Sequence, residues 1–269
     1  MSKILAIIGM HRSGTSLTAN WLQKNGLFIG NKLLSGGFDN INGHFEDIEI
    51  LKIHEQNLTR NGFVSNGLRI NLKNNFFLDK LAKEQLKKII DKRNDIYSLW
   101  GWKEPRGTLF INDWYNLNSD IYYLAVYRHY REVVDSLERR YYYTLFKTQN
   151  IKPLNKTFQK LFYPFYHYYN QKNYLIAWIK YNQTILHFKN KFPDNCLLIN
   201  ISDIHVLENK ILFILQEKLG FKALNISIST IFKENLLKKR INDNNLNKFS
   251  KILKVADKTL SALEIAKLK

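Results

Sequence analysis

The segment Lys3–Ile8, KILAII, and residues 9–16, GMHRSGTS, decide how the beginning of this chain folds. A short apolar run that ends at a glycine is typical of a strand buried in a parallel sheet. The glycine-containing loop leads into residues 16–25, where apolar side chains recur at helical spacing, and Gly26 suits the end of that helix. A strand, a loop and a helix in this order form the beginning of a βαβ unit.

The same apolar run does not indicate a membrane segment or a secretion signal. Residues 4–10 are far shorter than the roughly 20 residues that a membrane-spanning helix needs. One lysine precedes the run, and His11 and Arg12 follow it without a small-residue cleavage pattern. The single cysteine, Cys196, cannot form an internal disulfide, which favours a reducing compartment. We therefore expect a cytoplasmic protein without a transmembrane segment.

The 269 residues are 45% hydrophobic and 24% charged, which rules out a disordered chain and fits a single domain spanning residues 1–269. Apolar runs alternate with segments of helical periodicity. We expect strands at 3–8, 97–102, 121–127 and 196–201, and helices at 16–25, 48–61, 79–95, 109–115, 131–143, 174–189 and 206–219. This alternation predicts an α/β fold with a mostly parallel sheet. Residues 221–269 have the pattern of a helical tail.

Positive charge is concentrated in the second half of the chain. Lys and Arg number 41 against 23 Asp and Glu, a net charge of +18, and residues 137–269 hold 23 of these bases but only 9 acids. Such a balance suggests an anionic partner, such as an acidic polysaccharide, a membrane surface or a polyphosphorylated cofactor. The alternative is that lysines simply occupy solvated faces. No arginine-rich tract or zinc spacing supports sequence-specific nucleic-acid binding.

The loop GMHRSGTS resembles the phosphate-binding loop G-x-x-x-x-G-K-[ST], with one exchange. Thr15 replaces the lysine, and a cation appears three positions earlier, at Arg12. Backbone N–H groups and a helix N-terminus would still surround an anion, and the arginine fork can bind two oxygens at once. We predict that Arg12, Ser13, Gly14, Thr15 and Ser16 bind a terminal anionic group, unlike the loop of an ATPase. The alternative is a glycine turn without a ligand.

A second anion site is predicted after the strand Ile121–Tyr127. Arg128 follows this strand directly, and Ser136 lies eight residues further on, in the next helix. Because ligands of open α/β sheets bind at the carboxyl ends of the strands, the two side chains can converge on one phosphate. The alternative for Arg128 is an ion pair with Glu132.

Together, the two segments resemble the cofactor-binding signatures of sulfotransferases that depend on 3′-phosphoadenosine 5′-phosphosulfate (PAPS). The resemblance is strongest at residues 4–22, 44–47, 100–106 and 121–139, and weaker at 177–182 and 197–203. It implies a P-loop-like three-layer α/β sandwich, with PAPS as donor and 3′-phosphoadenosine 5′-phosphate (PAP) as product. The first loop would hold the 5′-phosphosulfate, and Arg128 and Ser136 the 3′-phosphate. Tyr130 departs from the family, which often has proline there.

Residues 43–47, GHFED, resemble a Gly-aromatic-Glu segment of bacterial sulfotransferases. The resemblance implies that Glu46 is the catalytic base, because the acceptor hydroxyl must lose its proton as the sulfuryl group arrives. His44 is the competing base, since its ordinary pKa suits the task, and Asp47 is a third candidate. Alternatively, Glu46 is an acid favoured at a helix N-terminus.

Residues 100–106, WGWKEPR, resemble the Lys-acid-Pro segment of tyrosylprotein and bacterial sulfotransferases. This implies that Lys103 is a cation on the transferring group and that Glu104 and Arg106 orient the loop or the acceptor. The alternative is an exposed lysine at a turn. Arg12 and Lys103 can supply the charge that a metal gives to ATP enzymes, and no His or Cys spacing suggests a metal site. We expect chemistry without a metal.

The aromatic-rich stretch 141–174 is the candidate acceptor region, which we interpret as an insertion between core elements. Aromatic rings stack on sugars, and basic residues attract anionic glycans. A carbohydrate acceptor is our prediction, drawn from the family resemblance. Core packing and a peripheral membrane contact are the alternatives for this stretch. For the whole chain, the alternatives are an ATP-using P-loop kinase, a non-catalytic nucleotide- or glycan-binding module, and a polyanion-binding protein.

Overall fold

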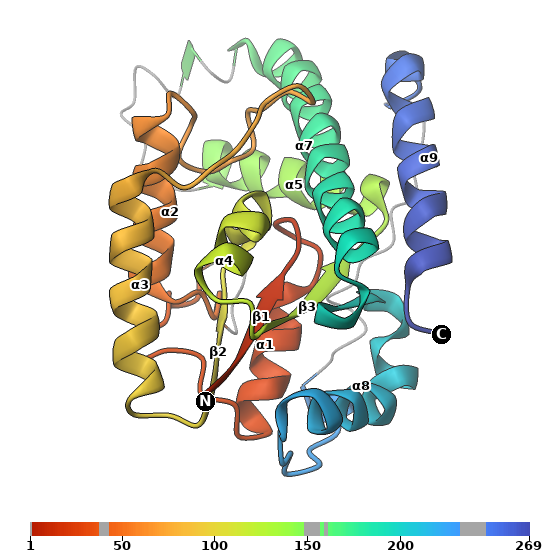
Figure 1. Ribbon diagram of the computed structural model, residues 1–269. Coiled ribbons are helices and arrows are strands. Elements are labelled where there is room, and N and C mark those ends of the chain that lie inside the picture. The colour runs from red at the N-terminus through yellow and green to blue at the C-terminus, as the bar shows by residue number, and fades with distance from the viewer. Residues whose placement is uncertain (1, 38–42, 148–156, 159–160, 232–245) are drawn as a thin grey trace.

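The fold is built on a central sheet of four parallel strands. The computed structural model describes residues 2–37, 43–147, 157–158, 161–231 and 246–269 (Figure 1). The strands are β1 (Lys3–Ile8), β2 (Leu99–Lys103), β3 (Ile121–Tyr127) and β4 (Cys196–Asn200), in the order β2-β1-β3-β4. Each pair is parallel, so all four strands end at the same edge of the sheet.

Helices cover both faces of this sheet. They are α1 (Thr15–Lys24), α2 (Ile48–Arg60), α3 (Lys80–Asn94), α4 (Ile111–Leu117), α5 (Tyr130–Lys147), α7 (Tyr163–Lys191), α8 (Ile204–Leu219) and α9 (Ser250–Ala266). Successive side chains of a strand point to opposite faces. Ile4, Ala6 and Ile8 of β1 belong to a core shared with α2–α5, α7 and α9, whereas Leu5 and Ile7 pack with α1 and α8.

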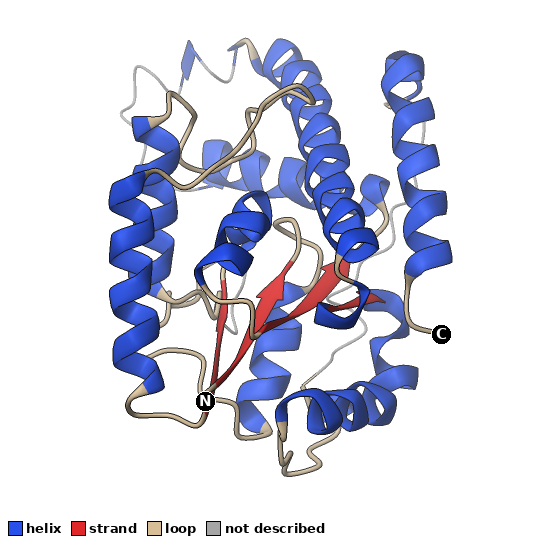
Figure 2. Cartoon of the chain, viewed as in Figure 1, coloured by secondary structure: helices blue, strands red, loops and turns tan. Residues whose placement is uncertain are grey.

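The result is a three-layer α/β sandwich, which confirms the predicted fold class (Figure 2). The buried strands follow from their sequences, because β1 and β3 carry apolar side chains on both faces and so need a covering layer on each side. Among the described residues, no helix is long and apolar enough to cross a membrane.

Two helices are longer than their apolar periodicity predicts. Residues 141–147 complete α5, and residues 163–174 form the beginning of α7, so both described ends of the aromatic stretch continue core helices. Tyr141 of α5 stacks on Tyr163 of α7 across this junction. Residues 148–156 and 159–160 lie outside the described residues, and the single domain with an insertion here stays a prediction.

The tail from residue 221 is less helical than its pattern indicates. Its regular helix is α9, while residues 232–245 lie outside the described part of the chain. Residues 221–227 form no regular helix or strand, and they bond to the end of α1: the Asn25 side chain donates to Ile226 O and accepts from Ile226 N. Trp21 Nε1 donates to the same carbonyl at 2.9 Å. These side-chain bonds satisfy the backbone N–H and C=O groups of Ile226, which would otherwise bond within a helix.

Candidate active site

The phosphate-type loop joins β1 to α1 at the carboxyl edge of the sheet. Gly9 has φ +144°, and a Cβ there would lie 2.2 Å from the carbonyl oxygen of Val126. Gly14 precedes α1 with φ +96°, and its Cβ would lie 2.3 Å from Cγ1 of Ile201. Only glycine fits such positive angles and close approaches. The loop is therefore pressed against β3 and the segment after β4, with the first N–H groups of α1 available to an anion.

Arg12 connects the loop to the second predicted anion site. It has φ +69°, and its Nε donates to Ser136 Oγ at 2.9 Å, across 124 positions of sequence. Ser13 beside it is fully buried, and its Oγ has no hydrogen-bond partner in the described parts of the chain. Because a buried hydroxyl normally has a partner, this unpartnered atom fits a loop that binds a polar ligand.

Arg128 lies directly after β3 and is 5% exposed. Its Nε donates to Glu132 Oε2 at 2.8 Å. The ion pair with Glu132, which was the alternative to anion binding for Arg128, is therefore present. Trp178 Nε1 donates to the Arg128 carbonyl at 2.9 Å and fixes the backbone. The Arg128 Nη2 atom is buried and has no hydrogen-bond partner among the residues described. One face of the guanidinium therefore stays available to an anion.

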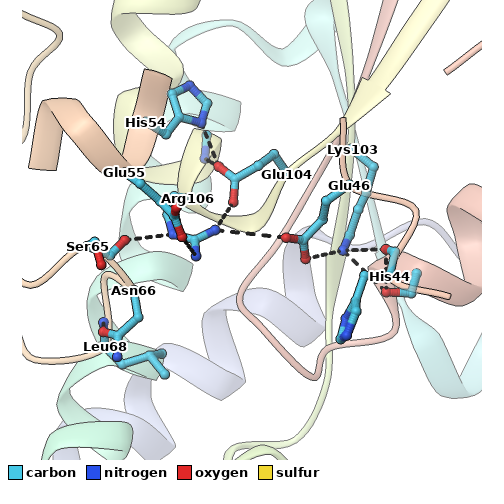
Figure 3. A network of polar contacts seen from close by, with 12 residues as sticks. His44, Glu46, His54, Glu55, Ser65, Asn66, Leu68, Lys103, Glu104 and Arg106 are labelled. Carbon is cyan, nitrogen blue, oxygen red and sulfur yellow. Dashed lines mark hydrogen bonds and ion pairs between the residues drawn. The ribbon is translucent and has the colours of Figure 1, made fainter. Parts of the chain in front are cut away.

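Lys103 is the centre of the next group of contacts. Its Nζ lies 2.9 Å from Glu46 Oε1, 3.0 Å from the His44 carbonyl oxygen and 3.2 Å from Ser16 Oγ (Figure 3). Ser16 Oγ also donates to the His44 carbonyl at 3.0 Å. Lys103 is 1% exposed, which excludes the alternative of an exposed lysine at a turn. This lysine thus joins the phosphate-type loop to the candidate base.

Asp47, rather than Glu46, is the helix N-terminal acid. Asp47 Oδ1 accepts from the backbone N–H of Glu49 at 3.0 Å and caps α2. Its Oδ2 forms an ion pair with Arg93 Nη1 at 2.6 Å. These structural contacts occupy Asp47 and leave Glu46 as the carboxylate that faces Lys103.

Glu46 is buried, and two effects on its pKa oppose each other. Burial raises the pKa of a carboxyl group, whereas the Lys103 ammonium stabilises the charged form; the net result is a lowered pKa. Glu46 is therefore ionised at neutral pH, as a base must be. His44 contributes its backbone carbonyl to the same group, and the choice between Glu46 and His44 as base stays a prediction.

Arg106 binds three carboxylates. Its Nη1 contacts Glu104 Oε1 closely and lies 3.9 Å from Glu46 Oε2, and its Nη2 lies 2.8 Å from Glu55 Oε1. Its Nε donates to the Ser65 carbonyl at 2.8 Å. Figure 3 shows Arg106 between Glu104 and Glu55 on one side and Glu46 on the other. Arg106 therefore links Glu104 and Glu55 to the loop that carries Ser65, and it lies within ion-pair distance of the candidate base.

Two buried side chains, Trp114 and His54, form a chain of hydrogen bonds that ends at Glu104. His54 Nδ1 lies 2.5 Å from Glu104 Oε2, and Trp114 Nε1 donates to His54 Nε2 at 3.0 Å. Since an indole only donates, the proton of the imidazole is on Nδ1 and is shared with Glu104. Burial alone raises the pKa of Glu104, but Arg106 and His54 lower it to about 2.

Sequence reasoning missed four residues of this site: His11, His54, Glu55 and Tyr181. His54 and Glu55 lie on α2 without any motif that marks them, and Tyr181 lies in the middle of α7. His11 is inside the loop motif, but that motif gives its position no role. Burial and the neighbouring Arg106 lower the pKa of His11 well below its ordinary value.

No group of three or more His, Cys, Asp or Glu side chains within the described ranges is arranged to hold a metal ion. The expected absence of a metal stays a prediction for the reaction itself.

Comparisons with known proteins concern the fold. The chain matches no model of a known protein family and no curated protein. Among solved structures, it is similar to a sulfotransferase domain from the curacin biosynthetic pathway, with 13% identity and a TM-score of 0.47 over 90% of this chain and 79% of that chain. A sulfotransferase domain from the Synechococcus PCC 7002 olefin synthase gives 18% identity and a TM-score of 0.44, over 98% and 94%.

Proposed function

We propose that this protein transfers a sulfuryl group from PAPS to a hydroxyl group of an acceptor, which we predict to be a carbohydrate, and releases PAP. One observation carries the proposal: Arg12 Nε donates to Ser136 Oγ at 2.9 Å. This contact brings together, in one place, the two segments that resemble the donor-binding signatures of sulfotransferases.

The residues present fit an elongated donor with an anion at each end. Residues 9–16 would hold the phosphosulfate, and Arg128 and Ser136 the 3′-phosphate. In support, Ser13 Oγ and Arg128 Nη2 are buried donors without hydrogen-bond partners among the described residues. Such atoms cost folding free energy unless a ligand or water satisfies them.

PAPS would supply an activated sulfuryl group, and the chain would supply position and charge. Glu46 accepts the proton of the acceptor hydroxyl. Lys103 and Arg12 stabilise the negative charge that develops during in-line transfer, as fixed charges do in phosphoryl transfer. In support, Lys103 Nζ lies within 3.2 Å of both Glu46 and Ser16, so its charge is held at the boundary between base and loop.

Calorimetric binding of PAP and of ATP tests the donor half of the proposal. We expect PAP to bind more tightly than ATP, and Arg128→Met to weaken PAP binding by about 10- to 100-fold, because hydrogen bonds to charged groups contribute about 1.5–3 kcal/mol. Arg139→Met is the matched control, since Arg139 is a more exposed arginine of α5 that also forms an i,i+4 ion pair with a carboxylate. Equal or tighter ATP binding would favour the kinase alternative.

Transfer of labelled sulfate from PAPS to oligosaccharides, phenols and lipids tests the catalytic half. Glu46→Gln should abolish transfer and leave PAP binding nearly unchanged. If the wild-type protein binds PAP but sulfates none of these acceptors, the chain is a nucleotide-binding module and the proposal is wrong.

A further inference from the structure

Two side chains to which the predicted motifs assign no role lie close to each other near the candidate active site. Tyr181 of α7 is fully buried, and its hydroxyl has no hydrogen-bond partner in the part of the chain that the structure describes. The same holds for the buried Nε2 atom of His11 in the phosphate-type loop. Their rings meet edge to face, with centroids 6.5 Å apart. Since buried polar atoms normally have partners, this pair indicates a place for a polar group.

The pair lies next to the charges of the active site. Glu46 and Arg106 are among the charges that act on the pKa values of both His11 and Tyr181. Gly67, with φ +66°, packs against Tyr181 and Arg106. A Cβ on Gly67 would lie 2.7 Å from the Tyr181 hydroxyl and 3.6 Å from Arg106 Cγ. Figure 3 shows the loop that carries Ser65 and Asn66 beside Arg106. The Tyr181 hydroxyl thus lies at Gly67 beside Arg106, whose Nη1 is 3.9 Å from Glu46 Oε2.

Both side chains are uncharged at neutral pH. Burial and then Arg106 lower the pKa of His11, with further effects of Glu46, Lys103 and Arg140. Burial raises the pKa of the Tyr181 phenol, so the hydroxyl keeps its proton. A neutral imidazole nitrogen can accept a hydrogen bond, and a phenol can donate one.

We infer that His11 Nε2 and Tyr181 Oη bind the hydroxyl group of the acceptor and hold it beside Glu46. An uncharged alcohol both donates and accepts, so it satisfies both atoms at once, whereas a carboxylate cannot donate to the imidazole. The inference rests on the proposed sulfotransfer. It assigns to this site an uncharged hydroxyl compound. In the bound state the single proton of the hydroxyl is donated to His11 Nε2. For transfer the hydroxyl turns this proton to the Glu46 carboxylate, while Tyr181 still donates to its oxygen.

Tyr181→Phe tests the inference, with Tyr123→Phe as the matched control. Tyr123 is also fully buried, and its hydroxyl also has no hydrogen-bond partner among the residues that the structure describes, but it lies on β3 against Phe188, within the core. Both substitutions remove an unsatisfied hydroxyl without changing the ring, so neither should lower the melting temperature. We expect Tyr181→Phe alone to lower kcat/KM for the acceptor about tenfold or more, since one hydrogen bond in a buried site has that effect. Its Kd for PAP should not change.

The probes are methyl glucoside, glycerol and phenol, measured by saturation-transfer NMR on the PAP-bound protein and by sulfate transfer from PAPS. We expect at least one of them to bind to the wild type and to Tyr123→Phe, and to bind at least about tenfold more weakly to Tyr181→Phe. His11→Gln keeps a polar amide near the position of Nε2 and should retain binding, whereas His11→Phe should lose it.

Two results would overturn the inference. If none of the three probes binds, or if both tyrosine variants behave alike, the two atoms bind only internal water or nothing. Because PAP binding is measured on the same samples, failure of the acceptor site is distinguished from failure of the proposed function, in which PAP itself would not bind.

Discussion

Replacing Glu104 by glutamine removes the buried negative charge that faces Arg106. Glu104 is fully buried, accepts from His54 Nδ1 and receives the backbone N–H of Gly107 at 3.2 Å. Glutamine has nearly the same shape, but its amide nitrogen would face a donor, either on Arg106 or on His54. The substitution therefore leaves a buried arginine without its closest counter-charge.

The lowered pKa of Glu104 sets the size of the expected loss in the free energy of unfolding. Its value of about 2, against an ordinary 4.5, corresponds to about 3 kcal/mol of stability, because each pKa unit is worth about 1.4 kcal/mol. Breaking a buried ion pair by removing one partner costs about 3–5 kcal/mol, a compatible figure. We expect Glu104→Gln to lower the free energy of unfolding by about 3 kcal/mol at neutral pH.

The pH dependence of this loss has a definite sign. A carboxyl group whose pKa is lowered in the folded state contributes stability above its unfolded pKa, and this contribution disappears as the pH falls toward the folded pKa. The difference between wild type and Glu104→Gln should be constant above about pH 5 and shrink by up to about 1.4 kcal/mol per pH unit below about 4.5.

Urea unfolding of both proteins between about pH 7 and pH 3.5 measures this difference. Glu84→Gln is the control, because Glu84 forms only an exposed 4.0 Å pair with Lys80 and should change stability by less than about 0.5 kcal/mol. A loss below about 1 kcal/mol at neutral pH, or a loss that does not depend on pH, would refute the role given to Glu104.

Three further predictions concern the loop, the lysine and the metal. Gly14→Ala should abolish PAP binding in calorimetry and lower the melting temperature, whereas Gly62→Ala, also at positive φ but with nothing within 4 Å, should cost only the backbone strain. Lys103→Met should lower the free energy of unfolding by about 3–5 kcal/mol by isolating the Glu46 charge, and adding Glu46→Gln should recover most of this in urea unfolding. Sulfate transfer should be unchanged by a chelator or by added magnesium; a rate that depends on magnesium would contradict the roles of the two cations.

The early strands and the glycine loop could be predicted from sequence because their determinants are local. The apolar run of β1 and the two glycines of the loop each act through neighbours in the chain or through the general need for burial. Arg12, Lys103 and Arg128 could be found in the same way, since each lies at the carboxyl end of a strand of the parallel sheet or within a few residues of it. The ends of such strands meet at one edge in any fold of this class.

The extents of α7 and of the tail could not be predicted in this way. At the beginning of α7, aromatic side chains occur on all sides of the helix, so no single apolar face marks it, and its first part was interpreted as an insertion. The segment after Gly220 has a helical pattern, but the Asn25 side chain bonds to its backbone instead, and only the folded chain brings that side chain to Ile226.

The sequence alone determined the layered α/β architecture and the positions of the phosphate-type loop and the candidate base, because burial and backbone conformation depend on local pattern. Only the tertiary structure decided which charges meet. The pairing of Arg12 with Ser136, the support of Glu104 by His54, and the approach of His11 to Tyr181 each join residues at least 50 positions apart. Contacts over such separations depend on how the helices pack, which no local pattern specifies.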